Sequence, residues 1–451
     1  MTTPNQGMKM HAIQYKDLLI NFTTEFDRVW NDRGTRAEQP VTFWRPSTSS
    51  DTLGNFISLG DVAVAGYHNI NQLKIAVVVS EADRENGTAL RAPADFERVW
   101  AHSGLRLRID FSVWRPIAPQ GYVAMGLVCG VGNDKPLRNT IRCVREDLVV
   151  PAHINQLIWK DKGSGARQDF SAWGISAPQA IAGQACLAPG TFTGTASYTR
   201  PTDQQAVHAL RLELTLHRQD LPPLPAFINT LEPQPLSEIE GTHVCELPWF
   251  MVRDPGLTPI EQLHTCPIYR LQRNDRYTLV ASGQNTTPAS KTFNWVVTKG
   301  EIGDNSVALH SVTGIDIETD WTTGHPLSAS AALARDFTHT TLSAKDWGRT
   351  TLLDVLAYIP GHQSVGAYLI RSQYQLLRAD GSQLAPSLTY ANGNNVYFSE
   401  FLQSQAAVPG GAVTEQPPEP ISETVPEEVP TLSENTLEIT PHDGIDDTLL
   451  P

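Results

Sequence analysis

The sequence predicts an all-β protein: an N-terminal pseudo-threefold β-prism, then an elongated antiparallel β-rich domain and a disordered acidic tail. The first observation is a tryptophan pair with a spacing of fourteen residues that occurs three times, as Trp30 and Trp44, Trp100 and Trp114, and Trp159 and Trp173. The second is that Phe-Asp-Arg-Val-Trp at 26–30 recurs as Phe-Glu-Arg-Val-Trp at 96–100. The third is that each unit ends in β-branched or alternating residues without helical periodicity. Repeats of this size bury a face only against their neighbours, so closure around a pseudo-threefold axis is expected.

Each repeat is expected to contain a hairpin. A glycine follows the first tryptophan of each pair by four residues, at Gly34, Gly104 and Gly163. A turn at that point lets the two tryptophan-bearing runs pair with each other. The tryptophans then supply large apolar area to a core that the repeats share.

Length and composition allow two folded domains and a tail. With 451 residues and 40% hydrophobic content, the chain has material for two cores. The prediction is a β-prism recognition domain at 1–221, a proline-rich linker at 222–236, a β-rich domain at 237–403 and an acidic tail at 404–451.

The charge distribution restricts the partners. The net charge is −14, but ten acidic and no basic residues lie between Ala406 and Pro451, so the rest of the chain carries about −4. The tail has too little apolar content to fold and is predicted to be disordered. The body lacks the basic patch that nucleic-acid binding needs, which excludes that class of partner.

No stretch approaches the roughly 18 to 20 apolar residues of a membrane-spanning helix, and the first residues lack the apolar core of a signal peptide. The chain is therefore expected to be soluble, to be made in the cytoplasm and to reach a target membrane only after release.

Its five cysteines are widely separated and odd in number. They are predicted to be buried thiols in a reducing compartment.

The second half contains one clear strand and one candidate hairpin. Lys291–Thr298 alternates so that Phe293, Trp295 and Val297 share a face. Weaker alternation predicts strands over 307–312, 315–321 and, after a turn at 323–326, 327–337. A transmembrane β-strand needs roughly 9 to 11 residues with one apolar face. The candidate membrane-inserting residues are Ile315, Ile317, Trp321, Leu327, Ala329, Ala331, Leu333 and Phe337.

An ordinary exposed sheet is the alternative interpretation of this region, since Arg335 interrupts the apolar row. Further on, Tyr374–Ser382 predicts a strand that runs into an Asp-Gly turn.

Candidate ligand-binding residues lie beside the second tryptophans: Trp44, Arg45, Asp61, Trp114, Arg115 and Tyr122. An arginine next to an indole can bind a lipid phosphate or sugar hydroxyls. The carboxylate of Asp61 can accept from a sugar, although its counterpart in the second repeat is Leu127. The alternative is structural, with the indoles packed in the core and the arginines stacked on them.

The sequence shows no catalytic or metal-binding pattern. It contains no His-Glu-x-x-His, no Gly-x-Ser-x-Gly and no clustered metal-ligand spacing. We therefore expect no enzyme, no metal and no cofactor.

The run from Phe43-Trp44-Arg45-Pro46 to Leu59-Gly60-Asp61, its second copy at Trp114-Arg115-Pro116, and Trp159-Lys160-Asp161-Lys162-Gly163 resemble the vacuolar protein sorting-associated protein 62 family. The resemblance covers roughly residues 20 to 215. Related β-prism modules bind membranes or sugars, so the resemblance implies a recognition domain.

Residues 262–401 contain Ser/Thr-rich predicted strands around the candidate hairpin. In this they resemble the pore-forming half of aerolysin-type and insecticidal β-toxins. This resemblance implies a pore-forming protein that recognises membrane lipid, a glycan or a membrane receptor and inserts a β-hairpin as a homo-oligomer. By analogy with toxin propeptides, the acidic tail would hold the soluble form. The alternative is a non-lytic trafficking or lectin-like binding protein.

Overall fold

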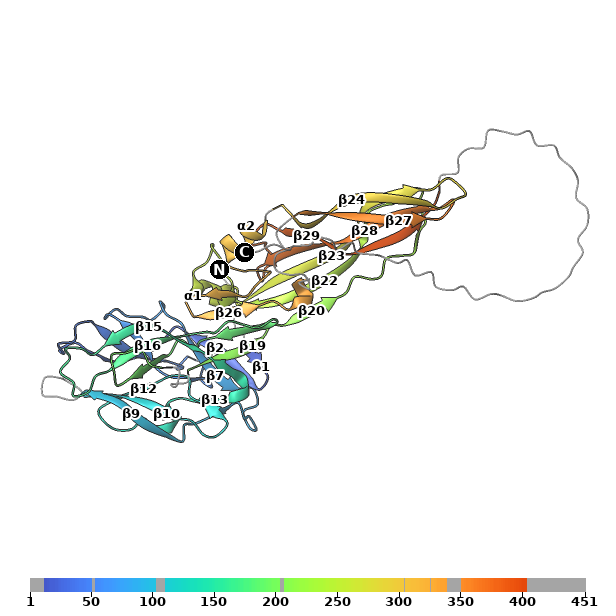
Figure 1. Cartoon of the computed structure of the whole chain (residues 1–451). Helices are drawn as coiled ribbons and strands as arrows, with labels where there is room; N and C mark the ends of the chain where they lie inside the picture. The colour runs from blue at the N-terminus through green and yellow to red at the C-terminus, as the bar shows by residue number, and fades with distance from the viewer. Residues whose placement is uncertain are drawn as a thin grey trace, which may run out of the picture. The chain divides into compact units, whose positions relative to one another are not determined.

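Strands make up nearly all the regular structure (Figure 1). This computed structural model describes residues 12–50, 53–102, 110–202, 207–303, 305–324, 326–338 and 350–403. The all-β prediction is confirmed. The predicted acidic tail and the turn at Gly104 lie outside the described residues.

Each repeat forms an antiparallel three-stranded sheet with the same strand order. The sheets are β3 (Phe26–Asn31), β4 (Val41–Pro46) and β6 (Val62–Ala65); β9 (Asp95–His102), β10 (Phe111–Ile117) and β12 (Val128–Val131); and β15 (His153–Lys160), β16 (Ser171–Ser176) and β18 (Phe192–Thr195). The first two strands of each sheet form the predicted tryptophan hairpin. The register shifts just before the first tryptophan in every repeat, at Val29, Val99 and Ile158, so the repeats share even a β-bulge.

A second small sheet accompanies each of the first. These sheets are β2 (Leu18–Thr23), β7 (Ala76–Glu81) and β5 (Ile57–Ser58), with β1 (Ile13–Tyr15) at the edge; β8 (Leu90–Arg91), β13 (Cys143–Arg145) and β11 (Tyr122–Val123); and β14 (Val149–Pro151), β19 (His208–Glu213) and β17 (Gln184–Leu187). Short 3-10 turns at Arg138–Thr140 and Glu146–Leu148 flank β13.

Three backbone hydrogen bonds link the repeats in a closed cycle. Asp61 N donates to Leu127 O at 2.9 Å, Leu127 N to Phe192 O at 3.1 Å, and Phe192 N to Asp61 O at 3.3 Å. The backbones approach closely here, because a Cβ on Gly126 would lie 2.5 Å from Cβ of Thr191. The repeats therefore meet at one point as a pseudo-threefold arrangement requires, and the name β-prism itself stays a prediction.

The first tryptophans fill a core that all three repeats share. Trp30 stacks on Phe111 of the second repeat with ring centroids 4.4 Å apart. Trp100 stacks on Phe170 of the third repeat at 5.3 Å, and Trp159 meets Phe43 of the first repeat edge-on at 6.0 Å. Each repeat thus buries its tryptophan against the next, as the repeat pattern predicts.

Long antiparallel strands form the sheet of the second half, several of which are labelled in Figure 1. In sheet order they are β20 (Leu216–Gln219), β22 (Leu236–Pro248), β23 (Ile268–Gln284), β28 (Ser364–Leu377), β29 (Leu388–Phe401), β24 (Lys291–Ile302) and β27 (Thr351–Ile359). Strand β24 confirms the predicted strand at 291–298. Strand β28 and the turn after it confirm the prediction at 374–382, where Gly381 N donates to Arg378 O.

The two halves share strands and a core. Strand β26 (Ala329–Ala332) pairs with β17 of the third repeat, and β25 (Trp321–Thr323) pairs with β26. Within the segment expected as a linker, β21 (Phe227–Ile228) pairs in parallel with the end of β29. Helix α1 (Pro259–Thr265) begins with a capping box between Thr258 and Glu261, after the 3-10 turn Trp249–Met251. The predicted division into domains stays a prediction.

The structure corrects the predicted hairpin. Residues 307–312 lie in helix α2 (Asn305–Thr313) instead of a strand, and 315–320 contain no strand. Asp316 bends the chain there, since its Oδ1 accepts from the backbone of Glu318 and Thr319. Only β25 and β26 of the hairpin exist, and helix α3 (Arg335–Thr338) follows. His325, in the predicted turn, lies outside the described residues.

All five cysteines are buried free thiols, as predicted. No helix in the described part of the chain is long and apolar enough to cross a bilayer.

Candidate functional site

The structure pairs two of the predicted ligand-binding residues with each other. Asp61 has a fully buried side chain and accepts from Arg45 Nε at 2.9 Å, from Arg45 Nη2 at 2.8 Å and from the backbone N of Cys129 at 2.6 Å. The same guanidinium donates to Cys129 O at 2.7 Å. Both oxygens of Asp61 are therefore occupied by this chain, and the contacts favour the structural alternative for the pair.

The two predicted tryptophans are also buried. Trp114 Nε1 donates to Ser112 Oγ at 2.8 Å, whereas Trp44 Nε1 has no hydrogen-bond partner among the described residues. Each indole packs in a small apolar cluster of its own repeat and does not belong to the core that Trp30, Trp100 and Trp159 fill. Ligand binding by these indoles stays a prediction.

Arg115 and Tyr122 line a surface cleft of about 370 Å³. Its other lining residues include Met125, Thr193 and His208. The Arg115 side chain is 36% exposed and donates to Glu97 at 3.1 Å and to Gly194 O at 3.5 Å, which leaves others of its five N–H donors for a ligand. Burial lowers the pKa of His208, and its Nδ1 has no partner within the described ranges.

This cleft brings together two predicted residues and two that sequence reasoning missed. Thr193 and His208 come from the third repeat, whereas Arg115 and Tyr122 come from the second. Among the residues that the structure describes, the lining contains one arginine and no carboxylate, together with apolar side chains. Such a cleft suits a small polar or anionic group that has an apolar side.

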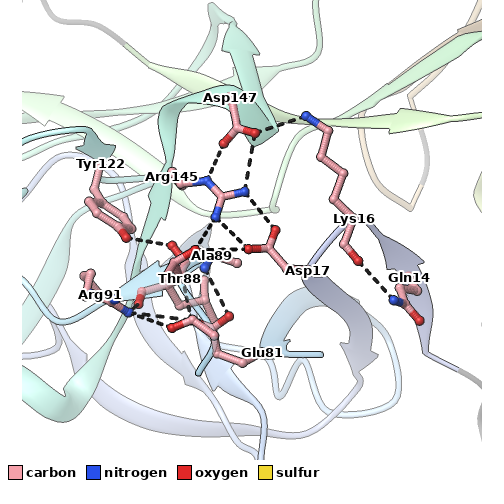
Figure 2. A network of polar contacts seen from close by, with 12 residues as sticks. Gln14, Lys16, Asp17, Glu81, Thr88, Ala89, Arg91, Tyr122, Arg145 and Asp147 are labelled. Atoms are coloured by element: carbon pink, nitrogen blue, oxygen red, sulfur yellow. Dashed lines mark hydrogen bonds and ion pairs between the residues drawn. The ribbon is translucent and has the colours of Figure 1, made fainter. Parts of the chain in front are cut away.

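A network of charged groups anchors one wall of this region (Figure 2). Arg145 in β13 bridges Asp17, at 2.6 and 2.8 Å, and Asp147, at 2.6 Å. Lys16 also donates to Asp147, and the bond to Arg145 is the main reason that the pKa of Asp147 falls to about 2. Tyr122 joins through Thr88, whose carbonyl accepts from its hydroxyl at 2.6 Å. The network ties the β1–β2 turn to the second repeat and holds Tyr122 in place.

The eight predicted membrane-inserting residues are buried together. Their exposed fractions run from 0% to 6%, and all belong to the core that the two halves share. Trp321 Nε1 donates to Met251 O at 2.9 Å, and Ala329 and Ala331 lie in the strand that pairs with β17. In this structure the segment 303–338 is therefore an integral part of the fold.

The chain leaves the sheet after β24 and returns to it before β27 at one place. Strands β24 and β27 pair from Lys291 opposite Ile359 to Lys299 opposite Thr351. Thr350 Oγ1 then donates to Glu301 O at 2.7 Å, just before the chain departs. The chain between Glu301 and Thr350 therefore begins and ends at the same end of the two-stranded β24–β27 ribbon.

The ribbon itself is apolar on both faces. Val297 and Val355 are buried on one face, whereas Val296, Leu352, Leu356 and Tyr358 are 61–72% exposed on the other. Sequence reasoning missed β27, whose alternation was concealed by apolar residues on both sides.

We expect the stability of this segment to depend on pH through Glu318. Burial, and next the charges of Asp316 and Glu301, raise the pKa of Glu318 to about 7. A carboxylate whose folded-state pKa is raised weakens the fold when ionised, so stability is gained as pH falls from about 7 toward 4.5.

We expect Glu318→Gln to raise the thermal unfolding temperature at pH 8 and to leave it unchanged at pH 4.5, measured by tryptophan fluorescence. Glu85→Gln, at an exposed position in the first repeat, should show no such difference between the two pH values. An equal effect of Glu318→Gln at both would contradict the assignment.

The three equivalent repeats define an all-β repeat module. The model of the vacuolar protein sorting-associated protein 62 family matches residues 1–228, and the chain belongs to this family.

Two solved structures show a weak likeness to this chain. GNIP1Aa from Chromobacterium piscinae is 26% identical with a TM-score of 0.36, over 43% of this chain. The chain spans only 37% of the length of GNIP1Aa. Cry35Ab1 is 12% identical with a TM-score of 0.30, over 86% of this chain and 90% of its own. No curated protein matches the chain.

Proposed function

We propose that this protein is a pore-forming, toxin-like protein. Its N-terminal repeats would recognise a membrane receptor or glycan, and the chain between β24 and β27, whose described residues 305–324 and 326–338 contribute to the core, would leave that core and insert as a β-hairpin. The observation that carries the proposal is that both ends of this segment emerge together from the β24–β27 ribbon. A segment attached in this way can extend the ribbon without breaking it, and it is long enough for two strands of roughly 9 to 11 residues.

The free-energy cost of removing the segment from the core must be offset by the free energy gained when it inserts into a bilayer. Removing large apolar side chains such as Ile315, Trp321 and Phe337 from the core costs about 1.5 to 3 kcal/mol for each one. A bilayer restores that apolar environment, but it requires every backbone polar group to be paired. Only a closed ring of hairpins meets this requirement, so the active form would be a homo-oligomer.

Recognition is assigned to the cleft of Arg115, Tyr122 and His208. Its arginine, whose side chain is 36% exposed, offers polar contacts beside apolar walls. A glycan or a lipid headgroup presents this combination of groups.

A single substitution tests whether the segment must move. Ser330 in β26 lies directly opposite the native Cys186 in β17. Cα atoms of opposed antiparallel residues are about 4.5 to 5.5 Å apart, within the range that a disulfide spans. Ser330→Cys should therefore form a disulfide that locks β26 to β17. We expect the reduced form to release dye from liposomes of total lipid extract and the oxidised form to lose at least 90% of that activity.

The controls separate the two functional hypotheses. Ser330→Ala removes the hydroxyl without a crosslink and should release dye under both redox conditions. The full chain and a chain ending at Gln405 are compared, which also tests the proposed role of the tail. Equal release from oxidised and reduced Ser330→Cys would reject insertion of this segment. Binding without release from every form would favour the non-lytic binding protein, in which β25 and β26 stay in the core.

A further inference from the structure

Four side chains form a row across four neighbouring strands of the long sheet. Arg218 in β20 lies opposite His243 in β22, His243 opposite Arg273 in β23, and Arg273 opposite Tyr374 in β28. Directly opposed residues project from the same face of a sheet. The four side chains can therefore act on one neighbouring element.

That element is α3, at the end of segment 303–338. Arg218 forms an ion pair with the carboxylate of Asp336. Arg273 Nη1 donates to the backbone oxygens of Asp336, at 2.8 Å, and Phe337. Tyr374 donates its hydroxyl to Phe337 O at 3.2 Å. Three members of the row thus hold α3 by its polar groups.

His243 lies between the two arginines and must be neutral there. Its Nδ1 is 3.0 Å from Arg273 Nη2, and a guanidinium can only donate, so Nδ1 is the acceptor. The other ring nitrogen, Nε2, lies 3.0 Å from Asp220 Oδ1 and donates to it. A proton on Nδ1 would turn this hydrogen bond into a contact between two donors.

The charges around His243 do not remove this conflict. Asp275 Oδ2 lies 3.8 Å from Nδ1 of His243, but this oxygen accepts from Arg273 at 2.8 Å, and the other oxygen of Asp275 accepts from Ser372 at 2.6 Å. Asp336 is engaged by Arg218, and Asp220 is 88% exposed. Burial, and next the charge of Arg273, lower the pKa of His243 below its usual 6.5, although Asp220 and Asp275 oppose the shift.

We propose that the row of Arg218, His243, Arg273 and Tyr374 is an acid-sensitive clamp that holds α3 against the sheet. Protonation of His243 adds a third cation to the row and removes an acceptor from Arg273, which loosens its hold on α3. The clamp would regulate the segment of the proposed function and rests on it only for the membrane step. Because the folded state favours neutral His243, the clamp's contribution to stability is complete above about pH 6.5 and is lost as pH falls below it.

Hydrogen exchange of the full-length protein tests the clamp directly. Peptides covering 326–338 are followed from pH 7.5 to 5.0, and the rates are corrected for intrinsic exchange. Opening of this segment should increase up to tenfold for each pH unit below about 6.5. His243→Asn keeps an acceptor near Nδ1 but cannot be protonated, and it should flatten this dependence. His217→Asn, next to Arg218 on β20 but 64% exposed, should keep the wild-type profile.

A flat wild-type profile would overturn the clamp, even if His243→Asn fails to fold. Loss of the pH dependence of exchange in His217→Asn would overturn the clamp as well. Dye release separates the clamp from the proposed function. Acid-dependent opening with no release at any pH would leave the clamp and reject the pore, whereas release with acid-independent opening would do the reverse.

Discussion

Replacing Asp61 by alanine is expected to destabilise the N-terminal repeats by about 3 kcal/mol. Removing one partner of a buried ion pair typically costs about 3 to 5 kcal/mol, because the other charge stays without compensation. The lower end applies, since the Arg45 side chain is 31% exposed and can turn toward water. The substitution also leaves the backbone N of Cys129 without its acceptor. Urea unfolding followed by tryptophan fluorescence measures the loss.

The second repeat supplies a matched control. Arg115 occupies the position equivalent to Arg45, but its partner Glu97 is 61% exposed. Exposed ion pairs contribute about 0 to 1 kcal/mol, so Glu97→Ala should cost less than 1 kcal/mol. Equal losses from Asp61→Ala and Glu97→Ala would show that burial of Asp61 does not decide its role.

This contrast marks how far the sequence predicts the candidate site. Aligning the first two repeats makes Leu127 the counterpart of Asp61. The cycle of backbone hydrogen bonds among Asp61, Leu127 and Phe192 confirms that these positions are equivalent. The alignment did not reveal that Asp61 lies where the repeats meet, buried against Arg45. Only the fold brings in Thr193 and His208, since the cleft joins strands of two repeats that are far apart in sequence.

Segment 303–338 departs from the sequence prediction for a different reason. Alternation over 307–312 and 315–321 matches a strand locally, but a strand forms only with a partner that pairs with it. In this segment β26 pairs with β17 of the other half of the chain, and the short β25 pairs with β26. Asn305–Thr313 forms a helix, and the side-chain bonds of Asp316 end any extended run after it. Tertiary context therefore overrides the local pattern.

The tryptophan repeat predicts the shared core correctly for the first tryptophan of each pair, and the second large effect follows from it. The prediction is wrong for Trp44, Trp114 and Trp173, which lie in outer clusters. Replacing Trp159 by alanine should cost about 3 to 5 kcal/mol, because the side chain is fully buried and a large cavity would remain. Its indole N donates to Gln39 O at 2.8 Å, so that oxygen also loses its donor. Urea unfolding again measures the change.

The loss should extend to the other two repeats, because Trp159 contacts Phe43 of the first repeat and Trp100 of the second. Hydrogen exchange should therefore accelerate in β4 and β9 as well as in β15. Trp173→Ala, in the same repeat but in an outer cluster, should cost less and act on β16 and its neighbours alone. If Trp159→Ala loosened only the third repeat, the three units would have separate cores, and the pseudo-threefold arrangement would describe their geometry but not their stability.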